Sequence, residues 1–310
     1  MPVNAYEVRG LTKVYAGRKQ PANIDVSLDI RSAELFCLLG NNGSGKSTLI
    51  RQLACLVKPS AGRIFFFGKD AVRHAQEVHE RAGYMPQTGF SLGHLTVSEA
   101  VYFSGRLRGL TRRDARRDRD EIVERFGMGR VVKDVSQRLS GGQRRLVQFA
   151  LCIAGRPDVV ILDEPTNDLD AGRRRLIWDV CADLKHDTGS TIVLVTHDVA
   201  EAERVIDRVA IMREGRVAGV GTPAELRRNV EERLCVRVMA EARPASTWEW
   251  SEPERGSWLT YVHPCELPDF MASLTPEQLG NVRVEPVGLR YLVNKWQAAD
   301  QGRVLGGVVS

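Results

Sequence analysis

The sequence predicts an α/β fold in which a mixed sheet is flanked by helices, with a helical subdomain and a small α+β domain at the C-terminal end. Three observations predict it. Short apolar or β-branched runs alternate with helical patterns over residues 4–86 and 156–222, as expected of strands joined by crossover helices. Residues 88–155 are dominated by helical periodicity. After residue 240 the composition shifts, and four of the five tryptophans lie there, which indicates a separate module.

These patterns divide the chain into three parts. Residues 1–87 and 156–232 are expected to form one core that combines parallel with antiparallel strands. Residues 88–155 are expected to form the helical subdomain, and residues 233–310 the small α+β domain.

Two local signals support this organisation. Val209–Met212 and Arg216–Val220 flank Glu214-Gly215, which favours a hairpin that closes the core. In the helical segment, Thr96-Val97-Ser98-Glu99 has the spacing of a capping box, which predicts that a helix begins there.

A phosphate-binding loop is the strongest chemical motif. It follows the apolar strand pattern Leu35–Leu39 and precedes the helical pattern Thr48–Leu53, the context that such a loop requires. Its glycines let backbone N–H groups surround phosphate oxygens at a helix N-terminus. Lys46 is expected to reach the β- and γ-phosphates, and Ser47 to ligate Mg2+. The bland alternative is a glycine-rich turn with an exposed lysine. The expected nucleotide contacts are Gly40, Asn41, Asn42, Gly43, Ser44, Gly45, Lys46, Ser47 and Thr48.

Two acids end a second apolar strand, Val159–Leu162. A buried parallel strand delivers its last residues to the carboxyl edge of the sheet, where ligands bind. Asp163 is expected to hold Mg2+, directly or through water, and Glu164 to polarise a water for attack on the γ-phosphate. The alternative is that both acids only cap the next helix.

Together with these motifs, Ser140-Gly141-Gly142-Gln143 resembles the signature of ATP-binding cassette (ABC) transporter nucleotide-binding subunits. The resemblance runs from about residue 4 to about residue 235. It implies a P-loop NTPase core of the ABC type, RecA-like with added antiparallel strands, and a helical subdomain that carries the signature. ATP and Mg2+ are the implied cofactors, and ATP hydrolysis coupled to transport is the implied activity.

The resemblance assigns further residues. Tyr15 matches the aromatic residue that stacks on adenine, although a tyrosine at a strand edge is the alternative. Gln87 matches the glutamine that joins the Mg2+ site to the coupling region, and His197 matches the histidine that contacts the γ-phosphate. Asp170 matches the aspartate of the loop between the two sites. Asp168 departs from the glycine often found at its position.

The signature implies a dimer. In this family Ser140, Gly141, Gly142 and Gln143 begin a helix and face the γ-phosphate of the nucleotide held by the opposite subunit. Each ATP is therefore expected to lie between two subunits, with a homodimer as the expected form, and hydrolysis to let the subunits separate. The expected partners also include separate transmembrane permease subunits, which would hold the chain peripherally at the cytoplasmic face of the membrane.

Composition agrees with this reading. No run approaches the roughly 18 to 20 apolar residues of a membrane-spanning helix, and the N-terminus lacks a signal pattern. A transporter pore is therefore expected in another polypeptide. No nucleic acid is expected, because the arginines that crowd one segment alternate with acids and favour a solvated helix face: Arg106, Arg108, Arg112, Arg113, Arg116, Arg117 and Arg119.

The six cysteines are scattered, with no pair at metal-ligand spacing. Most stand among apolar neighbours, so reduced core residues of a cytosolic protein are expected: Cys37, Cys55, Cys152, Cys181, Cys235 and Cys265.

The C-terminal module predicts strands at 233–240, 258–262 and 282–286, with helices at 266–274 and 288–297. It is similar to the α+β extension of daunorubicin-resistance-type drug and antibiotic exporter ATPases. Its tryptophans are expected to fill a small core, with contact between Trp248, Trp250 and a partner or membrane as the alternative.

The resulting expectation is the ATPase subunit of an ABC-2-type exporter of drugs, antibiotics or lipid-like compounds. A soluble ABC ATPase of DNA repair or translation and the motor of an importer remain alternatives, because they share the nucleotide motifs. A non-catalytic regulatory cassette is the third alternative, and the presence of Glu164 and His197 argues against it.

Overall fold

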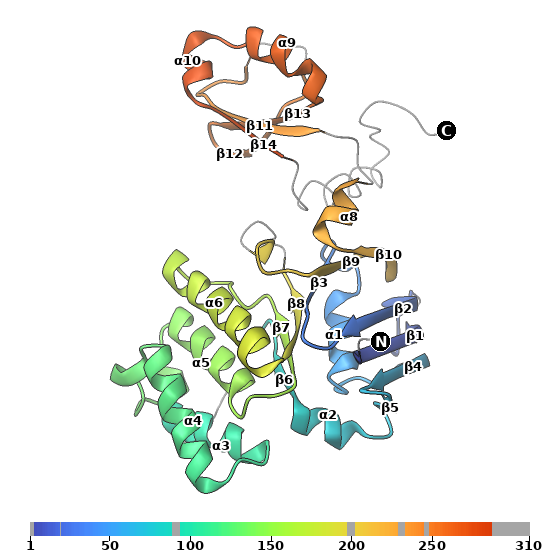
Figure 1. The fold of residues 1–310 in the computed structure, drawn as a ribbon, viewed down its shortest axis with the longest axis vertical. Helices are drawn as coiled ribbons and strands as arrows, with labels where there is room; N and C mark the ends of the chain where they lie inside the picture. The colour runs from blue at the N-terminus through green and yellow to red at the C-terminus, as the bar shows by residue number, and fades with distance from the viewer. Residues whose placement is uncertain are drawn as a thin grey trace. The chain divides into compact units, whose positions relative to one another are not determined.

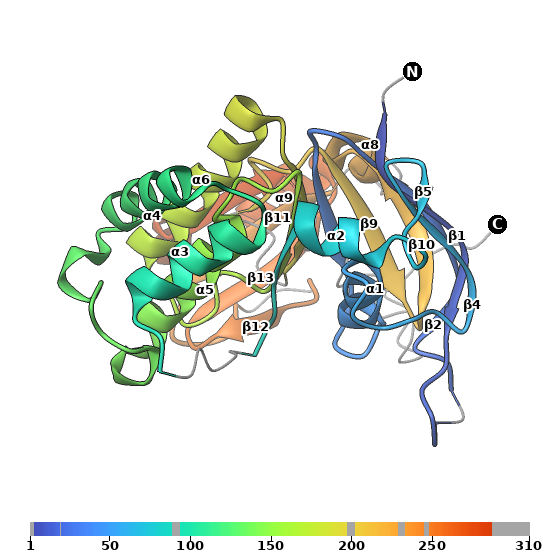
Figure 2. The ribbon, with the colours of Figure 1, turned by 90° about the horizontal axis from the view of Figure 1, so that it is seen from below.

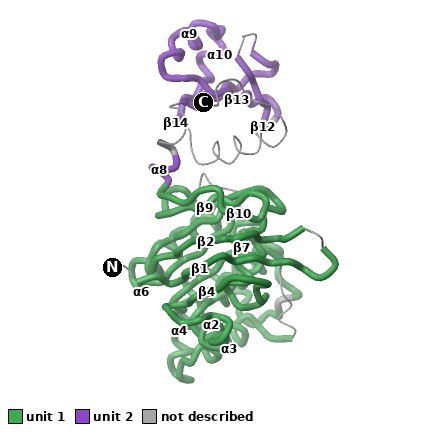
Figure 3. Tube along the Cα trace, turned by 90° about the vertical axis from the view of Figure 1, so that its right-hand side faces the viewer, with its two compact units in different colours: residues 1–222 green, residues 223–310 purple. Residues whose placement is uncertain are grey.

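The computed structural model describes residues 3–18, 20–88, 94–196, 202–228, 233–244 and 248–286. The chain divides into two compact units, residues 1–222 and 223–310 (Figure 3). This division lies ten residues before the boundary expected at 233, because the helix after Thr222 groups with the second unit.

Two sheets and their helices make up the first unit (Figure 1). The elements are, in chain order, β1 (Asn4–Lys13), β2 (Asn23–Arg31), β3 (Leu35–Leu39), α1 (Lys46–Leu53), β4 (Ala61–Phe66), β5 (Lys69–Asp70), α2 (Ala75–Arg81), β6 (Ala82–Met85), α3 (Val97–Leu107), α4 (Arg112–Arg125), η1 (Met128–Arg130), η2 (Ser136–Arg138), α5 (Gly141–Ile153), β7 (Val159–Asp163), α6 (Ala171–Thr188), β8 (Thr191–Val195), β9 (Arg208–Arg213) and β10 (Arg216–Gly221).

The larger sheet has the strand order β10-β9-β3-β8-β7-β6. Its strands β9, β3, β8, β7 and β6 are parallel, and β10 adds an antiparallel edge through the predicted hairpin at Glu214-Gly215, which is confirmed. Every residue of β3, β7 and β8 is buried, which explains why these strands are continuous apolar runs rather than alternating ones. The mixed sheet of the predicted fold class is therefore confirmed.

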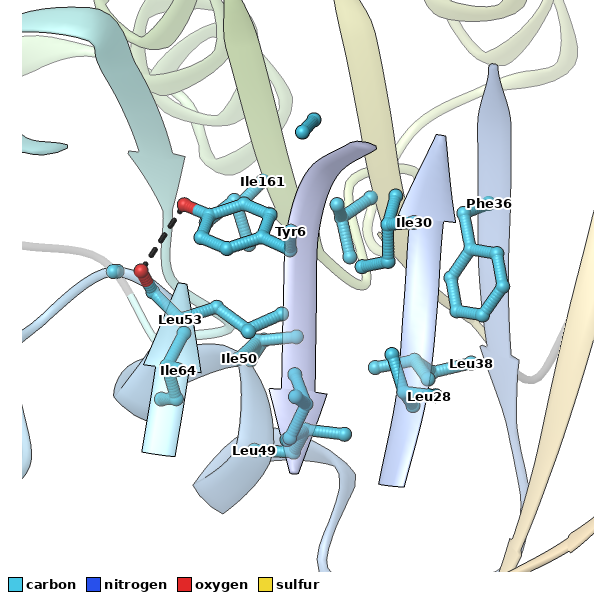
Figure 4. Close-up of a cluster of buried hydrophobic side chains, with 14 of the residues drawn as sticks. Tyr6, Leu28, Ile30, Phe36, Leu38, Leu49, Ile50, Leu53, Ile64 and Ile161 are labelled. Carbon is cyan, nitrogen blue, oxygen red and sulfur yellow. Dashed lines mark hydrogen bonds between the residues drawn. The ribbon is translucent and has the colours of Figure 1, made fainter. Parts of the chain in front are cut away.

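A second, antiparallel sheet has the order β2-β1-β4-β5. Helix α1 lies between the two sheets, and its apolar face supplies Leu49, Ile50 and Leu53 to the shared core (Figure 4). Phe36 of β3 joins the same cluster. Because the phosphate loop leads directly into α1, the buried face of this helix anchors the loop.

Helices α3, α4 and α5 connect β6 to β7 and lie on the side of the larger sheet opposite α1 (Figure 2). Helix α3 begins with the predicted capping box. The Thr96 hydroxyl accepts from the Glu99 N–H, and the Glu99 carboxylate accepts from the Thr96 N–H, so this prediction is confirmed. Arg108 is an exception to the expected solvated arginine face, since its guanidinium donates to the carbonyl oxygens of Leu151 and Ala154 near the end of α5.

The second unit has an antiparallel sheet of order β12-β13-β11-β14 packed on short helices. Trp248 and Trp250 lie 5.5 and 5.8 Å from the Phe270 ring, centroid to centroid, and fill this small core as expected. The predicted helix at 288–297 lies outside the described residues, and β12 and α10 were not expected. The elements are α8 (Pro223–Arg228), β11 (Leu234–Met239), β12 (Ser251–Glu254), β13 (Ser257–Val262), η3 (Pro264–Glu266), α9 (Leu267–Ala272), α10 (Pro276–Gly280) and β14 (Val282–Pro286).

All six cysteines are free. Cys37, Cys152 and Cys181 are buried as expected, but the expectation that all six belong to cores is wrong for Cys265, which is exposed. Cys265 lies in a one-turn 3-10 helix at the surface, where its side chain accompanies His263 rather than apolar neighbours. Within the described ranges, no helix is both long and apolar enough to cross a membrane.

Tyr6 provides a test of the core. It is fully buried, and its hydroxyl donates to the Leu53 carbonyl oxygen over 3.1 Å (Figure 4). We expect Tyr6→Phe to lower the free energy of unfolding by about 1 to 2 kcal/mol, because the carbonyl loses a buried partner. Urea denaturation measures this, with Tyr102→Phe on α3 as the control. Equal losses in the two variants would contradict the role of this hydrogen bond.

The same group predicts a dependence on pH. Burial raises the pKa of Tyr6 well above its usual value of 10.0. Its contribution is therefore complete below pH 10 and is lost as the pH rises further, because only the unfolded chain then ionises this phenol. Urea melts at pH 9 and pH 11 should show a smaller loss of stability in Tyr6→Phe than in the unaltered chain.

Candidate functional site

A cleft of about 720 Å³ lies at the carboxyl edge of the larger sheet. Four pieces of the first unit meet there: the segment between β1 and β2, the phosphate loop at residues 40–47, the start of α1, and the residues that follow β6, β7 and β8. The cleft is lined by Tyr15, Arg18, Gln20, Pro21, Ala22, Asn42, Gly43, Gly45, Lys46, Ser47, Thr48, Gln87, Asp163, Glu164 and Val195.

Contacts from β2 hold the phosphate loop in place. Gly45 has a φ of 99°, and a Cβ atom there would lie 2.3 Å from the Ala22 carbonyl oxygen, so only glycine fits. The buried Asn23 donates through Nδ2 to the Gly45 carbonyl oxygen (3.1 Å) and accepts from Gln52 Nε2 (2.8 Å). The loop is therefore braced on its outer side while the cleft side stays open.

Lys46 lies inside the curve of the loop. Its ammonium donates to the carbonyl oxygens of Gly40 (2.6 Å) and Asn41 (2.8 Å). Burial lowers the pKa of Lys46, and the nearby carboxylates of Glu164 and Asp163 oppose that shift. A cation held this way can meet a phosphate with little change in its position.

Asp163 ends β7 with its carboxylate buried, and neither of its oxygens has a hydrogen-bond partner among the described residues. Burial raises the pKa of this carboxyl. The nearby Ser47 hydroxyl and the charges of Arg51 and Lys46 oppose this shift of the pKa. A buried carboxylate beside a hydroxyl fits a cation ligand, and Gln87 lines the same cleft. No three His, Cys, Asp or Glu side chains gather as a metal cluster in the described part of the chain.

Glu164 follows directly in a left-handed conformation, with a φ of 53°. Its N–H donates to the Val195 carbonyl oxygen at the end of β8 (2.8 Å), and its side chain is nearly buried at the cleft wall. Left-handed backbone is uncommon for a residue other than glycine, and such conformations gather at functional sites. This geometry turns Glu164 out of the strand toward the cleft.

Tyr15 follows β1 at the rim of the cleft. Its hydroxyl lies 3.5 Å from Thr48 Oγ1, and the Lys13 ammonium lies 5.2 Å from the centroid of its ring. The lining of the cleft therefore combines an aromatic side chain, the phosphate loop and two acids.

The signature turn, residues 140–143, lies elsewhere. It is the start of α5, where the Ser140 hydroxyl accepts from the Gln143 N–H (3.3 Å) and Gln143 Oε1 accepts from the Ser140 N–H (2.9 Å). Gly141 is exposed, and a Cβ atom there would meet nothing within 4 Å. None of these four residues lines the cleft that the described residues form.

Asp170 is exposed and begins α6, where its Oδ1 accepts from the Arg173 N–H (2.9 Å). The position of His197 lies outside the described residues. Of the expected nucleotide contacts in the phosphate loop, Gly40, Asn41 and Ser44 do not line the cleft. The signature turn and Asp170 do not line it either. The expected residues that the structure brings together there are Tyr15, Asn42, Gly43, Gly45, Lys46, Ser47, Thr48, Gln87, Asp163 and Glu164.

Sequence patterns missed Arg18, Gln20, Pro21 and Ala22, which also line the cleft. They lie between Tyr15 and β2 in the chain, and this position is the one signal that could have indicated them. No sequence pattern pointed to Asn23, because its role comes from its contact with Gly45.

Comparisons with known proteins agree with this site. Residues 24–167 match the family model described as ABC transporter. The chain is 36% identical over 226 residues to the daunorubicin/doxorubicin resistance ATP-binding protein DrrA of Streptomyces peucetius, covering 73% of this chain and 68% of that protein. It is 35% identical over 247 residues to the human phospholipid-transporting ATPase ABCA7, covering 80% of this chain but 11% of that protein.

Solved structures give the same result. An ATP-binding subunit of an ABC transporter superposes with a TM-score of 0.68 and 28% identity, covering 73% of this chain and 92% of that chain. A dimeric post-hydrolysis state of the ATP-binding cassette MJ0796, bound to ADP and Pi, superposes with a TM-score of 0.65 and 25% identity, covering 70% of this chain and 98% of that chain. With its phosphate loop, paired acids and separate signature turn, this chain belongs to the ABC transporter family, as an ATP-binding and ATP-hydrolysing nucleotide-binding subunit.

Proposed function

We propose that this chain is the motor of an exporter, which dimerises on ATP and drives separate transmembrane permease subunits. One observation supports it most: the phosphate loop and the two acids meet in one cleft, while the signature turn lies outside that cleft, with Ser140 and Gly141 exposed. A chain with this arrangement offers half of each of two composite sites, which two copies complete together.

The residues of the cleft have distinct roles in this proposal. Tyr15 stacks on adenine, and the loop N–H groups with Lys46 bind the phosphates. Asp163, Ser47 and Gln87 hold Mg2+, which supplies charge neutralisation at the phosphate oxygens. Glu164 accepts a hydrogen bond from the attacking water and orients it toward the γ-phosphate. His197 is proposed to contact the same phosphate.

The second half of the site comes from the partner subunit. In the proposal the N–H groups of Gly141 and Gly142 in the signature turn bind the γ-phosphate of the nucleotide held by the other copy. Asp170, at the start of α6, lies between the two sites. Hydrolysis removes these contacts, so the two copies separate and the attached permease changes state.

Export of amphiphilic compounds is supported by the relatives. DrrA is named for resistance to daunorubicin and doxorubicin, and ABCA7 for phospholipid transport. Both names describe large amphiphilic molecules, so we propose drugs, antibiotics or lipid-like compounds as cargo. The chain then acts peripherally at the cytoplasmic face of the membrane, through its permease.

Lys46→Ala tests the phosphate site. We expect the affinity for ATP to fall by about 100-fold, because a buried charge-assisted contact to the phosphates is lost. Fluorescence titration with a labelled ATP analogue measures the loss, with Lys58→Ala as the exposed control. An unchanged dissociation constant for Lys46→Ala would refute the placement of the phosphates.

Glu164→Gln tests the catalytic role. The amide keeps the shape of the side chain but is a poor base, so kcat should fall by about 100-fold or more while ATP binding persists. Size-exclusion chromatography with ATP and Mg2+ should show a persistent dimer. Glu124→Gln on the exposed face of α4 is the matched control. Normal turnover of Glu164→Gln would sink the assigned role.

Copurification tests the partner. Affinity-tagged Glu164→Gln chain, isolated with ATP from detergent-solubilised membranes of its host, should carry a polytopic membrane protein identified by mass spectrometry. The Lys46→Ala chain should recover less of it, because its nucleotide-dependent dimer does not form. Recovery of ribosomes or DNA-bound proteins in place of a membrane partner would contradict the transporter proposal. It would instead favour an ABC ATPase of translation or DNA repair.

A further inference from the structure

A buried arginine connects the signature helix to the catalytic acids. Arg145 lies in the second turn of α5, with 5% of its surface exposed. Its guanidinium makes six hydrogen bonds, five of them to backbone carbonyl oxygens. The acceptors are Pro86 O (3.0 Å), Gln87 O (2.9 Å), Asp163 O (2.8 Å), Glu164 O, Pro165 O (3.3 Å) and Gln148 Oε1 (3.2 Å).

The five carbonyl acceptors belong to two different loops, whereas Gln148 lies on α5 itself. Pro86 and Gln87 follow β6, and residues 163–165 are the end of β7 and the start of its loop. Strands β6 and β7 are parallel neighbours, paired from Ala82↔Val159 to Met85↔Leu162, so their last carbonyl groups emerge side by side. One planar guanidinium therefore binds both loops at the point where the ladder of the sheet ends.

Arginine is suited to this position. It presents five N–H donors in a rigid plane, and it has no acceptor that would compete with the carbonyl groups. Without it, several buried carbonyl oxygens would lose their partners. A lysine has a similar charge, but its single ammonium cannot span acceptors in both loops.

The contact with Glu164 connects this arrangement to catalysis. Glu164 has a φ of 53°, and left-handed backbone directs its carbonyl group away from the strand ladder. Arg145 Nη2 donates to that carbonyl oxygen and to the carbonyl oxygen of Asp163. The guanidinium thus holds the backbone turn that points the Glu164 side chain at the cleft wall.

We propose that Arg145 is a positioning residue for ATP hydrolysis, which holds Glu164 and the Gln87 loop in their hydrolysis-competent arrangement and ties both to the signature helix. The inference rests on the proposed function of Glu164. Helix α5 begins with the signature turn, which is proposed to contact the nucleotide bound by the partner. A shift of α5 there would move Arg145 and the loop carbonyl groups that it binds beside the chain's own nucleotide. Arg145 then couples the two composite sites.

Arg145→Lys tests the proposal. We expect kcat for ATP to fall by about 100-fold, the size of loss that a misplacement of about 1 Å produces. The dissociation constant for ATP should stay within about 2-fold, because the phosphate loop is braced separately by Asn23. Arg117→Lys, at a side chain that is 81% exposed on α4, is the matched control and should change neither quantity.

A double-mutant cycle separates positioning from general destabilisation. If Arg145 acts through Glu164, adding Arg145→Lys to Glu164→Gln should lower the residual turnover by less than about 3-fold. Multiplicative losses in the double variant, an ATP affinity that falls in parallel with kcat, or an unchanged kcat would each overturn the proposal.

The same turnover assay distinguishes a failure of the proposed function of Glu164 from a failure of the role proposed for Arg145. Normal turnover of Glu164→Gln overturns the role of Glu164 and with it this inference, whereas slow Glu164→Gln with normal Arg145→Lys overturns the role of Arg145 alone. Should Arg145→Lys unfold, Gln148→Met removes one acceptor of the guanidinium and should lower kcat several-fold at unchanged ATP affinity. Normal turnover of the folded Gln148→Met chain would then count as the overturning result.

Discussion

The shape of the phosphate loop is the constraint on which the rest of the first unit depends. Gly40 lies so close to the β9–β10 hairpin that a Cβ atom would be 2.2 Å from the Met212 carbonyl oxygen. The Gly215 N–H donates to the Ser44 carbonyl oxygen (3.0 Å), and the Gly215 carbonyl oxygen accepts from the Ile24 N–H (2.8 Å). Three segments that are far apart in sequence therefore hold the loop in this shape.

Charged groups near the cleft differ from those that only support the fold. The buried Glu34 carboxylate accepts from Arg208 Nη1 over 3.1 Å, and its other neighbour is the Arg31 N–H (2.7 Å). Asp163 is equally buried but has no such partner among the described residues. A buried acid that is paired with an arginine, as Glu34 is with Arg208, holds a fixed contact in the fold. A buried carboxylate without such an ion pair destabilises the fold unless a cation binds to it. This contrast supports the proposed role of Asp163 as a ligand of Mg2+.

Much of the fold could be predicted from local patterns. The buried strands β3, β7 and β8 are uninterrupted apolar runs, and the capping box at Thr96 depends on residues three apart. The phosphate loop and the two acids are equally local. What escaped prediction depends on contacts between distant segments: Asn23 against Gly45, and Arg145 against the loops after β6 and β7. An amphipathic pattern places Arg145 on a helix but does not say which carbonyl groups it meets.

The exposed position of the signature turn has a consequence for when the chain consumes ATP. If catalysis needs two chains, the rate of ATP hydrolysis by free chains scales with the square of their concentration while they are mostly monomeric. That rate is therefore small when the chains are dilute. When two copies are tethered to one membrane assembly, the bulk concentration of the chain no longer sets this rate. The effective concentration of one copy at the other sets it instead, typically of millimolar order for short flexible links. ATP is then hydrolysed mainly within the membrane assembly, because an isolated chain binds nucleotide but lacks the second surface that hydrolysis requires.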